Sequence, residues 1–117
     1  MSREAGNRAE EAAADYLRSR GFEILRRNYA IRGAEVDIIA KEGDFIVFVE
    51  VKHRKSTQYA LARESVTPAK QRRICMAALR WLQENGLQEA NVRFDVVESG
   101  PLGITLLRGA FDDAAGA

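Results

Sequence analysis

The chain has 117 residues, of which 46% are hydrophobic and 30% charged, as is typical of one soluble globular domain. One cysteine and one histidine exclude a disulfide framework, a cysteine-based zinc site and a histidine-rich metal centre. No stretch is apolar enough to cross a membrane and the N-terminus has no signal-peptide pattern, so we expect a cytoplasmic protein without a membrane partner. We expect one domain over residues 1–111 and a disordered tail over residues 112–117.

Charge is nearly balanced, at a formal net charge of +1, but it is unevenly distributed along the chain. Residues 52–73 hold seven Lys and Arg against one acid, and residues 18–32 hold five arginines against one acid. Such segregation hints at a basic face for a polyanion, although a charge run is usually only a solvated surface.

The spacing of apolar residues predicts the order αβββα, followed by two more strands. Gly21 is expected to end the first helix, and Thr67 and Pro68 to start the second as N-cap and first-turn residues. In chain order, the expected elements are a helix over residues 2–20, a strand over 22–29, a loop over 30–34, a hairpin of strands 35–40 and 45–52, a basic connection over 53–66, a helix over 68–84, and strands over 92–98 and 104–108. This order predicts an α/β sandwich with a central mixed sheet.

The hairpin places three charged residues, Asp37, Glu50 and Lys52, in strands that are otherwise apolar on both faces. Charged groups in such strands need a partner or a metal. If the turn centres on Glu42 and Gly43, Asp37 lies opposite Phe48, and Asp37 and Glu50 are diagonal neighbours roughly 7–8 Å apart. A register shifted by two residues places the two carboxylates directly opposite each other, again on one face.

Two carboxylates beside an ammonium group suit a hard divalent cation such as Mg²⁺ or Mn²⁺. The alternative is a buried salt-bridge cluster that fixes the register of the strands. Glu35, on the same face, is expected either to join this site or to pair with Arg32 or Arg54.

Short sequence motifs along most of the chain match a known family. They comprise Gly6 and Glu10 and residues 21–25, 28–29, 32–39, 48–54, 65–67, 70–71 and 93–97. The chain resembles the bacterial YraN (UPF0102) family over residues 6–112. Its Asp37 and Glu50-Val51-Lys52 are similar to the D…(D/E)-x-K signature of restriction-endonuclease-like nucleases, with which this family is grouped beside the archaeal Holliday-junction resolvases.

The resemblance implies a restriction-endonuclease-like αβββαβ(β) fold and a set of site residues. Asp37 and Glu50 match the metal-binding acids, Lys52 the catalytic lysine and Glu10 the acid of the first helix. With them, the Val51 carbonyl is expected as a further ligand of Mg²⁺ or Mn²⁺.

Phosphate contacts are expected from the basic residues near this site. Arg54 shares the face of Lys52, and Lys70 and Gln71 lie at a helix N-terminus, where anions bind readily. Arg32 is a further candidate. For each of these, a solvated surface residue is the alternative. His53 is expected on the surface or in a structural role, and Cys75 and Trp81 in the core.

The leading functional hypothesis is a magnesium-dependent endonuclease that acts on DNA, branched or damaged DNA included. The alternatives are a non-catalytic module that binds nucleic acid or a DNA-processing partner, and a protein–protein adaptor with a salt-bridged core. Because the chain offers few surfaces to grip a duplex, a homodimer is a further expectation.

Overall fold

The computed structural model describes residues 2–54 and 66–112, with side chains from residue 7 onward. Most of the basic connection and the last five residues of the predicted tail lie outside the described residues. The elements are α1 (Ser2–Ser19), β1 (Glu23–Ile31), β2 (Ala34–Glu42), β3 (Phe45–His53), α2 (Pro68–Glu84), β4 (Asn91–Gly100) and β5 (Gly103–Phe111).

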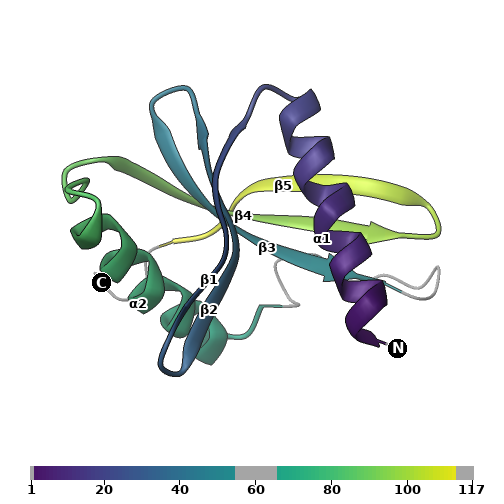
Figure 1. The fold of residues 1–117 in the computed structure, drawn as a ribbon, viewed down its shortest axis with the longest axis horizontal. Coiled ribbons are helices and arrows are strands. Elements are labelled where there is room, and N and C mark those ends of the chain that lie inside the picture. Colours follow the sequence, from purple (N-terminus) through teal and green to yellow (C-terminus); the bar gives the residue numbers. More distant parts are fainter. Residues whose placement is uncertain (1, 55–65, 113–117) are drawn as a thin grey trace.

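The strands form a five-stranded sheet whose spatial order follows the chain, β1-β2-β3-β4-β5. Neighbouring strands are antiparallel except β3 and β4, which are parallel and are joined through α2. Figure 1 shows this sheet strongly twisted, with α1 along one side and α2 along the other. The predicted α/β fold with a central mixed sheet is therefore confirmed, in the order αβββαββ.

Helix α1 packs against β1, β3 and β4 through a stripe of mostly small residues. Ala13, Ala14 and Leu17 are fully buried there. The helix ends as predicted at Gly21, whose φ of +92° is readily reached by glycine. The N–H of Phe22 then donates to the carbonyl of Leu17 at 3.0 Å, which closes the last turn.

Helix α2 covers the other face of the sheet, against β1 and β2. Thr67 accepts a hydrogen bond from the N–H of Lys70 at 3.2 Å, as expected of an N-cap. Trp81 meets Phe48 edge to face, with ring centroids 6.1 Å apart, and Cys75 is buried beside them, so both predicted core residues are confirmed. No helix in the described part of the chain is long and apolar enough to cross a lipid bilayer.

Two predicted loops are shorter in the structure. Residues 30–34 are not a loop, because β1 continues to Ile31 and only Arg32 and Gly33 separate it from β2. Gly33 has a φ of +84°, which allows so tight a turn. In the same way β4 continues to Gly100 and β5 begins at Gly103. The turn between the two predicted strands, residues 99–103, therefore shrinks to two residues.

The register between β2 and β3 differs from the first of the two predicted alternatives. Ile38 pairs with Val49 and Glu42 with Phe45, so Asp37 does not face Phe48. The turn is displaced because Gly43, at φ +58°, is its first residue rather than its second. Continued by one residue, the observed register places Asp37 opposite Glu50, as the shifted alternative predicts.

A network of charged residues lies on the α1 face, near the turn between β2 and β3. We call Arg93, Asp95, Glu42 and Arg108 the Arg93 network. Arg93 donates to both oxygens of the fully buried Asp95, at 2.9 and 2.8 Å, and to Glu42 at 2.6 Å. Arg108 binds Glu42 through two further hydrogen bonds of 3.0 and 2.7 Å. The network ties β2, β4 and β5 together.

Replacing Glu42 with glutamine is expected to lower the free energy of unfolding by about 1–2 kcal/mol at neutral pH. Hydrogen bonds from Arg108 and Arg93 lower the pKa of Glu42 from 4.5 to about 2, against the opposing effect of desolvation. A depressed carboxylate pKa stabilises the fold above its ordinary value, and this stabilisation is lost as pH falls through the folded-state pKa. Urea unfolding between about pH 7 and pH 2 should therefore show the two proteins converging in acid. A difference that persists unchanged at pH 2 would contradict this assignment.

Candidate functional site

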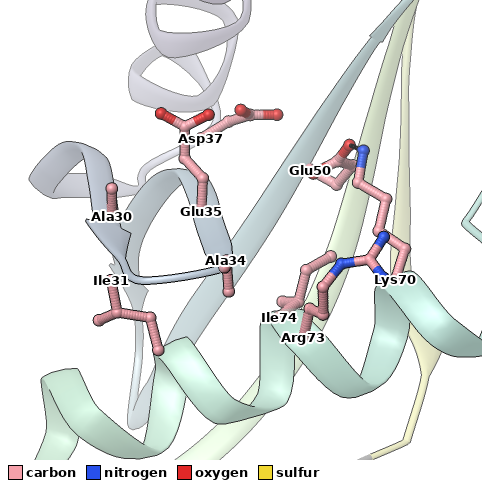
Figure 2. Close-up of a pocket in the computed structure, with 10 residues that line it drawn as sticks. Ala30, Ile31, Ala34, Glu35, Asp37, Glu50, Lys70, Arg73 and Ile74 are labelled. Atoms are coloured by element: carbon pink, nitrogen blue, oxygen red, sulfur yellow. Dashed lines mark hydrogen bonds and ion pairs between the residues drawn. The ribbon is translucent and has the colours of Figure 1, made fainter.

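A cavity of 460 Å³ separates the tip of the β1–β2 hairpin from the N-terminal half of α2. Figure 2 shows Glu35 and Asp37 on the hairpin side, with Glu50, Lys70 and Arg73 across from them. The remaining lining residues are small or apolar: Ala30, Ile31, Gly33, Ala34 and Ile74. The cavity is therefore charged on both sides, with two acids on the hairpin side and one acid beside two bases on the other, over an apolar floor.

Asp37 stands where the pairing of β2 with β3 ends. The last regular pair is Ile38 with Val49, and beyond it the N–H of Val51 donates to Asp37 Oδ2 at 2.8 Å. The aspartate side chain thus takes the place of a backbone acceptor and is held toward Glu50. Burial and then the charge of Glu50 raise the pKa of Asp37 from 3.8 to about 7.

Glu50 is the most enclosed of the acids in the pocket, with only 6% of its side chain exposed. Its Oε2 accepts a hydrogen bond from the Lys70 ammonium, which reaches across from α2, and lies 3.5 Å from Lys52 Nζ. Desolvation lowers the pKa of Lys52, partly offset by Glu50. Desolvation also lowers the pKa of Lys70, but the bond and charge of Glu50 outweigh it, so the net pKa is raised. Two ammonium groups therefore share one carboxylate oxygen.

Glu10 approaches the same acids from α1. Its side chain is 19% exposed and lies 3.9 Å from Arg27. Burial raises the pKa of Glu10, and the charges of Glu35 and Glu50 add to this, while Arg27 opposes it. Glu10 is thus close enough to interact with the acids of the pocket, although it does not line the cavity.

Asn28 is a residue of this region that the sequence did not single out for chemistry. The neighbouring β1–β2 pairs place it opposite Asp37, and its φ of +54° makes it the one non-glycine residue with positive φ among those described. Its side chain lies near Glu10 and acts to lower the pKa of that carboxyl, against the larger effect of burial. Strained backbone is often kept where it directs a functional side chain. Here the strained residue, Asn28, lies beside both Glu10 and Asp37.

The residues present fit a divalent cation held by two carboxylates. Mg²⁺ in proteins commonly takes one or two carboxylates and completes its coordination with water. The strand register, continued by one residue, places Asp37 opposite Glu50, and burial together with the charge of Glu50 raises the pKa of Asp37; a cation between the two acids would relieve this repulsion. Among residues 7–54 and 66–112, no three Asp, Glu, His or Cys side chains gather closely enough to hold an ion. A role of Glu10 as a further ligand therefore stays a prediction.

The predicted phosphate contacts divide into two groups. Lys70 lines the cavity, whereas Arg54 turns away from it and binds Glu98 at 2.6 Å. Gln71 donates to the carbonyl of Val66 at 2.9 Å and so holds the start of α2, and Arg32 is exposed in the hairpin turn. Val51 takes part through its N–H, as described, while a role for its carbonyl stays a prediction.

Arg73 lines the cavity; it belongs to the basic stretch over residues 52–73 but was not singled out as a site residue. It follows Lys70 by three residues, which is the spacing of neighbours on one face of a helix, so its position was available from the pattern. No residue in the first turn of α2 is acidic. The pocket therefore has two cations from α2 facing the acids of the sheet.

The chain was compared with known proteins. A family model described as "Uncharacterised protein family UPF0102" matches residues 9–98. A UPF0102 protein of Syntrophus aciditrophicus is 47% identical over 115 residues, which cover 95% of this chain and 91% of the relative. Another, from Geobacter sulfurreducens, is 48% identical over 92 residues, covering 79% and 72%. One from Desulforapulum autotrophicum is 46% identical over 110 residues, covering 91% of each protein.

Proposed function

For this chain, which belongs to the UPF0102 family, we propose the function of a magnesium-dependent endonuclease that hydrolyses phosphodiester bonds in DNA, branched or damaged DNA included. The observation that carries the proposal is that Asp37 and Glu50 line one pocket, with the ammonium group of Lys52 near the carboxylate of Glu50. Two acids with a lysine beside one of them suit metal-assisted phosphodiester hydrolysis.

The roles of the residues follow from their positions. Asp37 and Glu50 would hold the cation, and the hydrogen bond from Val51 orients Asp37 for this. Bound there, Mg²⁺ would polarise the scissile phosphate and favour ionisation of the attacking water. Lys52, 3.5 Å from Glu50, would donate a hydrogen bond to that water or offset the charge that develops on the phosphate.

The positive side of the pocket would receive the DNA backbone. Lys70 and Arg73 face the acids from α2, so a phosphate entering the cavity would lie between them and the acidic side. Such contacts position the nucleic acid without reading its sequence, which suits a substrate defined by shape.

A second candidate is a module that binds nucleic acid or a DNA-processing partner without cutting DNA. The contact of Lys70 with Glu50 favours it, because the most enclosed acid is already charge-compensated by protein side chains. The two candidates share the basic side of the pocket and differ in whether the acids take a metal ion.

Magnesium is expected to raise the melting temperature, and more strongly at about pH 8 than at about pH 6. The folded-state pKa of Asp37, about 7, lies above its ordinary value of 3.8. The folded chain therefore binds the additional proton between these values, and the metal-free protein loses stability as pH rises through this range. Because a cation needs the ionised carboxylate, its binding strengthens over the same range. A Mg²⁺ concentration of about 100 times Kd adds about 2.7 kcal/mol to the free energy of unfolding.

Thermal melts with and without Mg²⁺ at both pH values test this, beside Asp37→Asn. The variant should show no magnesium effect and a flatter dependence of stability on pH. Exposed Asp44 in the β2–β3 turn provides the matched control, since Asp44→Asn removes the same charge at a distance from the pocket. A wild-type melting temperature that does not change with magnesium at either pH value would overturn the metal site.

A further inference from the structure

Lys70 is placed unusually for a residue that serves only as a phosphate contact. It starts on α2, lines the cavity, and bonds directly to Glu50 Oε2, although 35% of its side chain is exposed. Glu50 already has Lys52 at 3.5 Å from the same oxygen. One carboxylate oxygen thus has two lysines, and the closer of them comes from α2 rather than from the sheet.

This contact conflicts with cation binding at the same carboxylate. A divalent ion on Glu50 and Asp37 would bring two positive charges to the oxygen that Lys70 occupies, so the ammonium group has to leave. Removing it costs the charge-assisted hydrogen bond unless Lys70 gains another anionic partner.

A DNA phosphate in the cavity supplies that partner. Arg73 lies one turn further along α2 and lines the same cavity, and the first turn of α2 has no acid to hold either side chain back. Lys70 is flexible and long, so its ammonium can turn from Glu50 to a phosphate without movement of the helix.

We propose that Lys70 is an internal counter-ion that couples metal binding to DNA binding, an inference that rests on the proposed metal site. Without DNA it neutralises Glu50 and weakens the binding of Mg²⁺. With DNA it moves to a phosphate and leaves Glu50 available to the ion. By linkage, Mg²⁺ then strengthens DNA binding by the same factor as DNA strengthens Mg²⁺ binding. The pocket thereby holds metal more weakly without substrate than with it.

The first test measures metal affinity without DNA, by calorimetric titration of Mg²⁺ and Mn²⁺ into wild type, Lys70→Met and Arg73→Met. Methionine keeps the length of the lysine stem and removes its charge. Lys70→Met is expected to bind the ions about tenfold or more tightly than wild type, a typical size for such coupling. Arg73→Met removes an equal charge from the same pocket without touching Glu50, so its gain should be only two- to threefold, roughly the general electrostatic effect.

The second test measures binding of a phosphorothioate-substituted DNA junction by fluorescence anisotropy, with and without Mg²⁺ at constant ionic strength. Wild type should bind the junction about 5–150 times more tightly with Mg²⁺. Asp37→Asn reports the effect of Mg²⁺ on the DNA alone and is subtracted. In Lys70→Met the enhancement should fall at least about fivefold, whereas Lys70→Arg, which keeps the charge, should retain most of it.

Equal metal affinities of Lys70→Met and Arg73→Met, or an unchanged enhancement in Lys70→Met, would overturn the inference and leave the nuclease proposal standing. No binding of either ion to wild type, with or without the junction, would overturn both. Should Lys70→Met fail to fold, Lys70→Gln is titrated in its place, with the same expected order of affinities.

Discussion

Cleavage of branched or flapped DNA should fall at least about 10²-fold when Lys52 is replaced with alanine, while Mg²⁺ still stabilises the folded protein and DNA binding stays nearly unchanged. A cation is not needed to ligate a cation, so the contribution of Lys52 belongs to the transition state. Its ammonium lies 3.5 Å from Glu50 Oε2, although Lys52 is not one of the residues that line the cavity.

The structure separates this role from that of a structural counter-ion. If Lys52 alone neutralised Glu50, its loss would leave a buried carboxylate unpaired, at a cost of about 3–5 kcal/mol. Lys70 bonds to the same oxygen, so Glu50 keeps a partner in Lys52→Ala. The variant should therefore unfold within about 1 kcal/mol of wild type, and its loss of activity cannot be ascribed to a damaged fold.

Single-turnover cleavage and thermal melting should be measured together, on junction, flap and linear substrates with Mg²⁺ and with Mn²⁺. Lys41→Ala, in the exposed part of β2, removes the same charge away from the pocket and is the control. Retention of full cleavage in Lys52→Ala would remove this residue from the mechanism. Binding of every substrate by wild type without cleavage of any would favour the non-catalytic module.

The elements of the fold could be predicted because local signals mark them. Thr67 and Pro68 begin α2 and Gly21 ends α1 by chemistry that depends only on neighbouring residues. The shared face of Asp37 and Glu50 could be predicted for a similar reason, because a two-residue shift in register preserves it. The register itself depends on where Gly43 lies in the turn, and the sequence permits either position.

Contacts between distant elements could not be predicted from the sequence pattern. The length of Lys70 lets it reach Glu50 from α2, but the choice of this partner depends on how α2 packs on the sheet. Arg54 shares a strand face with Lys52 and yet binds Glu98, because β4 lies parallel beside β3. Long charged side chains have many partners within reach, and only the tertiary arrangement selects among them.

The Arg93 network shows the same limit, since nothing in the alternation of β4 distinguishes a structural acid from a catalytic one. Asp95 is fully buried and accepts three hydrogen bonds, two from Arg93 and one of 2.9 Å from the N–H of Gly109. Gly109 lies where the pairing of β4 with β5 is shifted by a bulge. The carboxylate thus satisfies a backbone donor that the ladder leaves unpaired.

Replacing Asp95 with alanine is therefore expected to lower the free energy of unfolding by about 3–5 kcal/mol, the largest effect on stability that we predict. The variant leaves part of the Arg93 guanidinium and the Gly109 N–H without an acceptor in a buried site. Domains of this size are stable by only about 5–15 kcal/mol, so urea unfolding should shift to a much lower midpoint.

The location of Asp95 makes this effect distinguishable from damage to the pocket. Asp95 lies on the α1 face, whereas Glu50 and Lys70 meet on the α2 face. Mg²⁺ should thus stabilise folded Asp95→Ala by as much as it stabilises wild type. Asp44→Ala, which removes an exposed acid, should change stability by no more than about 0.5 kcal/mol. A loss below about 1 kcal/mol in Asp95→Ala would place the network among ordinary surface ion pairs, and a lost response to magnesium would mean that the two faces are coupled through β3 and β4.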